Sequence, residues 1–264
     1  MTAALATLTI PFLRGLGTGL SRRRVGLWND GGPVLRLAHI SDLHASPAIS
    51  LAHIEASLDL VLAEQPEVIA VTGDFVSDYA PDPDGLVRAL KRLSDAAPTF
   101  ACLGNHDGGP WSKQHGGPAH PGAVMEILKA AGIYLLNDET EKLELRGRPF
   151  LLTGVQDLWS YPIDQARAGF HPEAMPRIVL AHNPDTKDEL AQAPWDLMLS
   201  GHTHGGQIRL PFVGGRWTAP VRDDRFIEGL LPWGTRQIHI SRGVGSLHGL
   251  RINCPPEVTL LELS

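Results

Sequence analysis

Five short apolar runs in the sequence each end abruptly in a cluster of polar residues, and this repeated feature constrains the fold more than any other. Continuous apolar runs of this length, bounded by Gly and polar residues, are typical of buried strands. The chain is therefore expected to place several polar clusters at strand ends. The runs occupy residues 35–40, 68–71, 99–103, 178–181 and 197–199.

Two helix patterns separate the first three runs. One covers residues 54–62 and ends before Pro66, and the other covers residues 86–93 and follows Asp84, a candidate N-cap. The first three polar clusters consequently follow one another at intervals of 32 and 31 residues, about one βαβ unit. Because ligands gather at the carboxyl ends of strands in such layouts, all five clusters are expected at one edge.

The rest of the chain continues the pattern of helices and strands. A third helix is predicted at residues 121–131, with Gly132 as its stop. The sequence contains no internal repeat, low-complexity block or convincing linker, so residues 34–264 are expected to form one α/β domain. Further strand-like segments occupy residues 133–136, 143–145, 150–155, 237–241 and 257–263.

Residues 1–33 are predicted to form an N-terminal arm. Residues 5–20 contain Pro11, Arg14 and three glycines, so this mildly apolar stretch is too short and too broken to cross a bilayer. The arginines at 22–24 superficially resemble a twin-arginine export signal, but polar residues follow them where an apolar region should stand. A loosely structured arm is favoured over export, and a basic, apolar segment at a membrane surface is the other alternative. The expected location is the cytoplasm, with peripheral contact to the inner membrane through this arm as a variant.

Composition excludes several classes of protein. Hydrophobic residues make up 43% of the 264 and charged residues 20%, so the chain can build a substantial core and is not disordered. The formal net charge of −6 argues against a dedicated nucleic-acid binder, and no nucleic-acid partner is expected. Cys102 and Cys254 lie far apart and in no CxxC pattern, which predicts two buried thiols rather than a disulfide.

The residues that follow the five runs supply oxygen donors and imidazoles but no thiolate. This mixture suits Mn²⁺, Fe or Zn²⁺ better than it suits a cysteine-rich structural zinc site. Residues i and i+2 of a strand face the same way, so a pair such as Asp42 and His44 can direct two side chains to one place. Seven donors exceed what one ion takes from a protein and suit two ions that share a carboxylate. The candidate ligands are Asp42, His44, Asp74, Asn105, His182, His202 and His204.

The order of these motifs resembles that of the calcineurin-like metallophosphoesterases. The family pattern is Asp-x-His, Gly-Asp, Gly-Asn-His-Asp, a lone His, and Gly-His-x-His. All five blocks occur here in that order, and the resemblance covers residues 35–264. It implies a four-layer α-β-β-α sandwich with mixed central sheets. The blocks stand at residues 42–44, 73–74, 104–107, 182 and 201–204.

The resemblance also implies a role for each residue. His106 would face the substrate as a proton donor or charge stabiliser, and Asp107 would fix its tautomer. A hydroxide between two ions would attack phosphorus in line, with Mn²⁺ favoured and Fe or Zn²⁺ as alternatives. One ion would be held by Asp42, His44, Asp74 and His204, and the other by Asp74, Asn105, His182 and His202, with Asp74 bridging them.

Finer features narrow the expected activity. Residues 201–207 read Gly-His-Thr-His-Gly-Gly-Gln and residues 241–245 read Ser-Arg-Gly-Val-Gly. These segments resemble a bacterial branch that includes UDP-diacylglucosamine hydrolases of lipid A synthesis and cell-envelope phosphodiesterases. Hydrolysis of a phosphodiester or pyrophosphate bond in a small molecule is therefore predicted. A nucleotide-sugar lipid is the alternative substrate, although no amphipathic lid is evident. A phosphomonoesterase and a non-catalytic metal-binding scaffold are less favoured.

Several other residues have open roles. The loop at residues 108–121 is rich in Gly and Pro and is expected to border the site. Trp159, Trp217 and Trp233 are expected in core or rim packing, with stacking on a base or sugar as the alternative. His39 lies inside the first apolar run, where packing or a bond to the backbone is expected.

Overall fold

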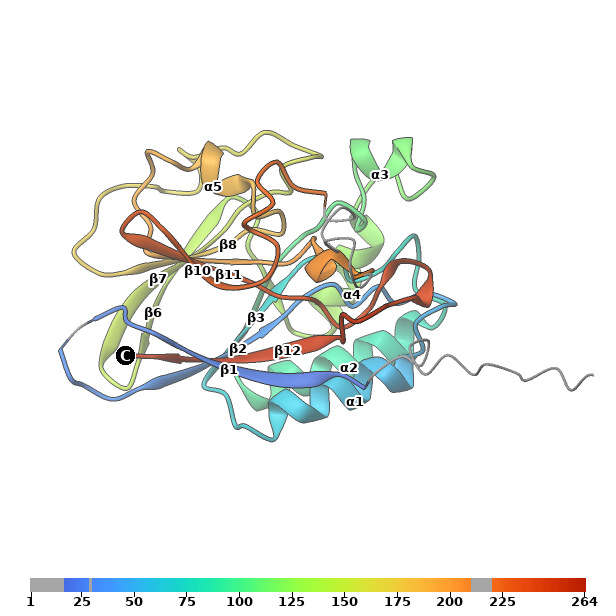
Figure 1. The fold of residues 1–264 in the computed structure, drawn as a ribbon, viewed down its shortest axis with the longest axis horizontal. Coiled ribbons are helices and arrows are strands. Elements are labelled where there is room, and N and C mark those ends of the chain that lie inside the picture. Colours follow the sequence, from blue (N-terminus) through green and yellow to red (C-terminus); the bar gives the residue numbers. More distant parts are fainter. Residues whose placement is uncertain (1–16, 29, 210–219) are drawn as a thin grey trace, which may run out of the picture.

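The computed structural model describes residues 17–28, 30–209 and 220–264, which build two six-stranded sheets that share a buried apolar layer (Figure 1). In the first sheet β12 is antiparallel to β2 and the other neighbouring strands are parallel. Its strands in spatial order are β1 (Gly19–Val25), β12 (Glu257–Leu263), β2 (Leu35–Ile40), β3 (Val68–Thr72), β4 (Thr99–Cys102) and β5 (Tyr134–Leu135).

The second sheet is also mixed. Its three central pairings are parallel, and the pairs β10–β11 and β7–β6 at its two edges are antiparallel. All five apolar runs of the sequence are strands, with ends within one residue of the predicted ones. The strands in spatial order are β10 (Gly229–Trp233), β11 (Arg236–Ile240), β9 (Leu197–Ser200), β8 (Arg177–Leu180), β7 (Arg148–Gly154) and β6 (Glu139–Leu145).

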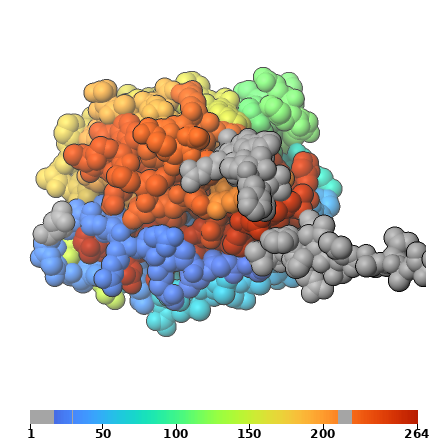
Figure 2. All heavy atoms as spheres, viewed as in Figure 1, coloured from blue at the N-terminus to red at the C-terminus, as the bar shows by residue number. Residues whose placement is uncertain are grey.

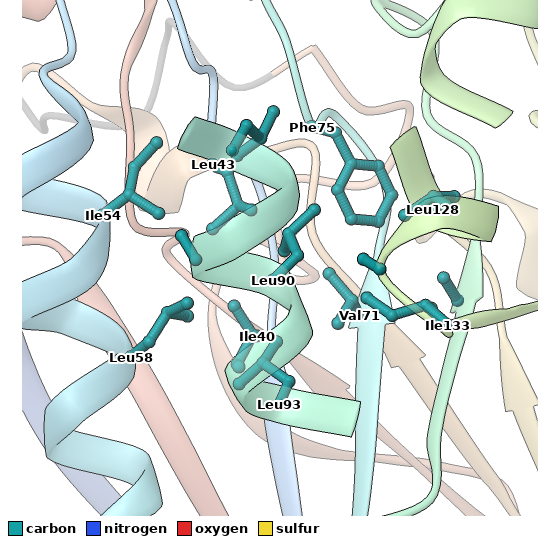
Figure 3. Close-up of a cluster of buried hydrophobic side chains, with 14 of the residues drawn as sticks. Ile40, Leu43, Ile54, Leu58, Val71, Phe75, Leu90, Leu93, Leu128 and Ile133 are labelled. Carbon is teal, nitrogen blue, oxygen red and sulfur yellow. The ribbon is translucent and has the colours of Figure 1, made fainter. Parts of the chain in front are cut away.

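Three helices cover the outer face of the first sheet. They are α1 (Leu51–Leu62), α2 (Pro83–Ala96) and α4 (Gly122–Ala130). Figure 3 shows side chains such as Leu58 of α1 and Leu90 of α2 pointing into one buried cluster with residues of β2 and β3. The apolar stripes of the three helices are thus buried against the sheet, as their sequence periodicity predicts.

The N-cap of α2 differs from the predicted one. Asp82, rather than Asp84, accepts a hydrogen bond from the backbone N–H of Gly85 at 2.8 Å. Pro83 then occupies the first turn, where its fixed φ suits a helix and its missing N–H costs nothing.

The space between the sheets holds a second buried cluster. Along β2, Leu37 faces this space while its neighbour Ala38 faces the helices, which follows the alternation of a strand. His39 also faces inward: its Nδ1 lies 2.8 Å from Nδ1 of His239 on β11, and its Nε2 lies 2.8 Å from Oγ1 of Thr72. His39 is therefore packed as expected, but it bonds side chains, one of them on the opposite sheet.

A thin layer covers the outer face of the second sheet. It contains the single helical turn α5 (Thr186–Glu189) and apolar side chains such as Trp195 and Phe226. The predicted α/β fold with two mixed sheets is confirmed, and its fourth layer is mostly connecting chain in the described residues. The remaining short helices are α3 (Pro110–Gln114), η2 (His204–Gly206) and η3 (Leu247–Gly249).

The folded chain begins earlier than the predicted boundary at residue 34. β1 pairs with β12 along all seven of its residues. Its three arginines interrupt the apolar alternation by which a strand is recognised in the sequence. Arg22 forms an ion pair with Glu64, and Arg24 forms one with Glu262. Charges on such an edge strand discourage pairing with another chain. Residues 1–16 of the predicted arm lie outside the described residues, and within the described ranges no helix has the length and apolar character needed to span a membrane.

Candidate metal centre

The five polar clusters come from both sheets. Three follow β2, β3 and β4 of the first sheet, and two follow β8 and β9 of the second. The carboxyl ends of these strands meet, so the backbone N–H of His202 donates to Oδ1 of Asp42 at 3.0 Å. The clusters thus converge as expected, but between two sheets rather than along the edge of one.

Four candidate ligands form a first group of donor atoms. Nε2 of His44 lies 3.1 Å from Nε2 of His204 and 3.4 Å from Oδ2 of Asp74. Nε2 of His204 lies 3.5 Å from Oδ1 of Asp42. All four side chains are buried, and one donor atom of each lies within 4.8 Å of the others. Carboxylate and imidazole donors that converge in this way can hold a metal ion.

A second group adjoins the first and shares Asp74 with it. Oδ2 of Asp74 lies 3.1 Å from Nε2 of His182, which in turn lies 3.2 Å from Nδ1 of His202. Oδ1 of Asn105 is buried and has no hydrogen-bond partner among the described residues. A buried acceptor without a partner is uncommon, and a bound cation would satisfy it.

Strained turns present most of these side chains. Five of the seven candidate ligands have a φ angle in the left-handed region, which residues other than Gly adopt infrequently. Such conformations cost free energy, and they persist at functional sites where the surrounding contacts hold them. The five are Asp42 (51°), His44 (48°), Asp74 (55°), His202 (70°) and His204 (51°).

Glycines in the motifs let these turns approach one another. A Cβ at Gly104 would overlap the carboxylate of Asp74, and a Cβ at Gly201 would overlap Asp42. Gly73 has a φ of +74°, and a Cβ there would come within 2.5 Å of the backbone nitrogen of Gly104. The turns after β3, β4 and β9 can pack this closely because these positions carry no side chain.

Burial keeps three of the candidate imidazoles uncharged. It lowers the pKa of His44 to about 3 and the pKa values of His202 and His204 well below the ordinary range. Burial also lowers the pKa of His182, but the Asp74 carboxylate outweighs it and raises that pKa to about 10. Although burial raises the pKa of Asp74, the charge of His182 holds it well below its usual value. Ionised carboxylates and neutral imidazoles are the forms that bind cations, so three of the four histidines already have that form, and a cation at His182 would displace a proton.

Hydrogen bonds to the outer ring nitrogens orient two of the imidazoles. Nδ1 of His182 donates to the carbonyl oxygen of Thr72 at 2.8 Å, and Nδ1 of His44 lies 3.1 Å from Oγ of Ser77. In a neutral ring, a proton on Nδ1 leaves the lone pair on Nε2, the nitrogen that faces the donor atoms; in His182 a cation would first have to displace the Nε2 proton. Sequence inspection does not single out Thr72 or Ser77, because their contribution depends on tertiary contact alone.

His106 and Asp107 make different contacts from those expected. Nδ1 of the half-buried His106 donates to the carbonyl oxygen of Ser77 at 2.9 Å. The carboxylate of Asp107 accepts from the backbone N–H groups of Asp74 (2.9 Å) and Gly104 (2.8 Å). Ser77 therefore fixes the tautomer of His106, a role expected for Asp107, and Asp107 ties the turn after β3 to the turn after β4.

Two tryptophans flank the donor groups. The ring of Trp159 lies edge-on to His202, with centroids 4.3 Å apart, and the ring of Trp111 lies edge-on to His106, with centroids 5.0 Å apart. The loop at residues 108–121 thus borders the site, as expected. No motif in the sequence marks Trp111, and its place in that loop is the signal that identifies it as a candidate.

The other tryptophans named from the sequence do not share this position. Trp233 stacks on Trp195 with centroids 5.3 Å apart, in the apolar cluster outside the second sheet. This is the core packing that was expected of it. Trp217 lies outside the described residues.

Comparison with known proteins agrees with the geometry of the site. The family described as calcineurin-like phosphoesterase matches residues 35–206, a segment that contains all seven candidate ligands. Phosphodiesterase YaeI of Escherichia coli (strain K12) is 42% identical over 246 residues, which cover 92% of this chain and 87% of that protein. UDP-2,3-diacylglucosamine pyrophosphatase LpxG of Chlamydia trachomatis is 29% identical, with 86% and 83% covered.

A solved structure shares the fold. NAD nucleotidase (NadN) of Haemophilus influenzae matches 82% of this chain with a TM-score of 0.52, and this chain spans about half of that protein, 48%. The sequence identity of 13% makes this a likeness of fold alone. The resemblance seen in the motifs is confirmed by the family match and by the relatives: the chain belongs to the calcineurin-like phosphoesterase family and is a metal-dependent phosphoesterase.

Proposed function

We propose that the protein hydrolyses a phosphodiester or pyrophosphate bond with the help of two divalent cations. The position of Asp74 carries this proposal. Its Oδ2 lies 3.4 Å from Nε2 of His44 in one donor group and 3.1 Å from Nε2 of His182 in the other. A carboxylate between two sets of donors is what a two-metal site requires. The first ion is assigned to Asp42, His44, Asp74 and His204, and the second to Asp74, Asn105, His182 and His202.

The chemistry of the donors fits this assignment. Asn105 offers a buried oxygen without another partner in the described structure, and burial keeps His44, His202 and His204 neutral. Mn²⁺ is the proposed ion, with Fe and Zn²⁺ as alternatives, since mixed nitrogen and oxygen ligands bind all three. A pair of such ions, once bound, would supply a hydroxide nucleophile at neutral pH and would neutralise the phosphate oxygens.

His106 is the proposed proton donor to the leaving oxygen. It is half-buried, whereas the histidines of the two donor groups are buried, so its ring is the one that a substrate can reach. Its Nδ1 is bonded to Ser77, which leaves Nε2 for the substrate. When protonated, Nε2 can donate to the oxygen as the P–O bond breaks. The Asp107 carboxylate contributes to the site by accepting a hydrogen bond from the backbone N–H of Asp74, which fixes the turn that presents this ligand.

A lipid-linked nucleotide sugar such as UDP-diacylglucosamine is the second candidate substrate. A cavity of about 570 Å³ lies between α2 and α4, and its mainly apolar lining includes Val76, Val87 and Ile127. Asp107 lines the same cavity, so the cavity adjoins the turn that carries His106. Its size and lining suit an acyl chain. LpxG, which is named for this substrate, supports the same candidate.

Hydrolysis assays on Mn²⁺-loaded protein test the proposal. Bis(p-nitrophenyl) phosphate should release p-nitrophenolate, and p-nitrophenyl phosphate, a monoester, should be the poorer substrate. Release of UMP from UDP-diacylglucosamine, without turnover of the aryl diester, would assign the lipid reaction specifically. Protein that hydrolyses none of these compounds, with or without added metal, would contradict the proposed function.

A pair of variants tests the cavity. Val87→Trp would fill it and should slow the release of UMP from UDP-diacylglucosamine while sparing the aryl diester. Leu60→Trp, on the exposed side of α1, is the matched control and should change neither rate. Unchanged UMP release by Val87→Trp would remove the support that the cavity gives to the lipid substrate.

Peripheral membrane contact belongs to the same lipid proposal. The predicted contact lies in residues 1–33, of which residues 1–16 lie outside the described structure. Co-sedimentation with anionic vesicles should be weaker for a variant that lacks residues 2–16 than for the full chain. Equal sedimentation would contradict a membrane role for this segment.

A further inference from the structure

Trp111 and Trp159 form an aromatic surface at the rim of the site. Trp111 lies on α3 and Trp159 in the loop between β7 and β8, and their ring centroids are 5.3 Å apart with a tilt of 37°. Both side chains are half-buried, so part of each remains exposed. Neither belongs to the three buried apolar clusters of the described residues. Figure 2 shows the green segment around α3 projecting from the surface. Core packing therefore does not account for this pair.

Each ring of the aromatic surface touches a residue of the proposed reaction site. Trp159 meets His202 at an interplanar angle of 86°, and Trp111 meets His106 at 71°. His202 is assigned to the second ion and His106 to the leaving oxygen. A phosphate held at the donor groups would consequently carry one of its substituents past these two rings.

The aromatic surface is held in place before any ligand arrives. The carboxylate of Asp157 accepts from the backbone N–H of Trp159 at 3.1 Å. On the other side, the ring of His115 stacks on Trp111 with centroids 4.0 Å apart, and its Nδ1 donates to the Trp111 carbonyl oxygen at 2.8 Å. The two loops also abut, because a Cβ at Gly109 would lie 3.0 Å from Oη of Tyr161. Preorganised rings lose little conformational freedom on binding, so more of the contact energy appears as affinity.

We propose that the aromatic surface binds the nucleobase of a nucleotide-containing substrate whose phosphate lies at the donor groups. This inference rests on the proposed function, because that function places the phosphate. Indole rings offer flat, apolar faces that stack on any base, and such stacking contributes roughly 5- to 150-fold in affinity. The apolar cavity between α2 and α4 is lined by other residues, so an acyl chain and a base would occupy separate places.

Calorimetric titration of the Mn²⁺-loaded protein with UMP and with ribose 5-phosphate tests the inference. The two ligands carry the same phosphate and sugar and differ in the base. UMP should bind at least about tenfold more tightly. Trp159→Ala and Trp111→Ala should bring the ratio of the two dissociation constants close to one, and Trp159→Phe should retain part of the preference. Loss of metal would affect both ligands alike, so the ratio reports on the base.

Trp233→Ala is the matched control, because Trp233 packs on Trp195 outside the second sheet, and it should keep the full preference for UMP. Equal affinities in the unmodified protein, or a preference that survives both alanine variants, would overturn the inference. Parallel assays with bis(p-nitrophenyl) phosphate separate this failure from a wider one. Hydrolysis without a preference for UMP would refute only base binding by the aromatic surface. Protein that neither hydrolyses the diester nor binds either ligand would refute the proposed function as well.

Discussion

Asp74 contacts both donor groups and also the proposed proton donor and the residue after it. Its Oδ2 faces both donor groups, its Oδ1 accepts from the backbone N–H of His106 at 2.9 Å, and its own N–H donates to Asp107. Its φ of 55° shows that the chain adopts a strained conformation to present this carboxylate. One side chain thus relates the two candidate ion positions to the proposed proton donor.

Replacement of Asp74 should remove metal and activity together. We expect Asp74→Ala to hold fewer than two ions per chain by elemental analysis. Its kcat/KM for bis(p-nitrophenyl) phosphate should fall by more than about a hundredfold. Replacing a residue that only hydrogen-bonds a metal ligand already costs about 10- to 100-fold in metal affinity or activity, and Asp74 is a proposed ligand itself. Asp84→Ala, at an exposed position on α2, should change neither quantity. Two bound ions with full turnover in Asp74→Ala would contradict the assignment.

Replacement of His106 should lower turnover and leave the metal content unchanged. General acid catalysis contributes about 10²- to 10⁴-fold, so His106→Ala should lower kcat by that factor for a diester with an alkoxide leaving group. The loss should be smaller for p-nitrophenolate, which needs little protonation to leave. His171→Ala, an exposed histidine outside the site, serves as the control. Equal losses for the two leaving groups would argue against proton donation.

At the scale of elements, the turns after the strands form the site, and glycine makes their close packing possible. The carboxylate of Asp107 links the turn after β3 to the turn after β4 through the backbone N–H groups of Asp74 and Gly104. Gly104 lies directly against the Asp74 carboxylate. The position of each ligand therefore depends on a neighbouring turn as well as on its own strand.

A methyl group at Gly104 should disturb this arrangement. We expect Gly104→Ala to displace the Asp74 carboxylate, to weaken metal binding in calorimetric titration with Mn²⁺, and to lower the free energy of unfolding by about 1–3 kcal/mol, the usual cost of overpacking. Gly122→Ala, where a Cβ would meet nothing within 4 Å, is the control. Mn²⁺ binding that is equally tight in both variants would show that the close approach is not needed.

At the scale of the whole molecule, the site exists only while the two sheets keep their relative position. The first sheet contributes Asp42 and Asp74, and the second contributes His182 and His202. The pair formed by His39 and His239 crosses the same interface. Bound cations would therefore join the sheets and stabilise the folded chain as a whole.

Metal binding should accordingly raise the melting temperature. Each ion at about 100 times its dissociation constant stabilises a protein by about 2.7 kcal/mol, which for a chain of this size raises Tm by about 5–10 °C per ion. Scanning calorimetry with Mn²⁺ and with a chelator measures the difference. Asp74→Ala should lose most of the increment, and the absence of any increment in the unmodified protein would contradict a site shared between the sheets.

The sequence by itself determined the five strands that precede the polar clusters, the three main helices and the order of those clusters. These features are local: an apolar run of three to six residues and the polar turn after it depend on neighbours in the chain. β1 could not be found in this way, because its arginines hide the pattern and its stability comes from pairing with β12 at the other end of the chain. The seven candidate ligands came from the motifs and their family resemblance, and their roles stay proposals.

Only the tertiary structure decided which atoms face one another. In the folded chain Asp107 accepts hydrogen bonds from backbone N–H groups, and Ser77 orients His106. Trp111 lies close to Trp159, which belongs to a distant segment of the chain. None of these contacts has a periodic signature, because each depends on how two sheets and their loops pack. Local sequence patterns fix where a side chain lies along its element, whereas the packing of apolar surfaces fixes what that side chain meets.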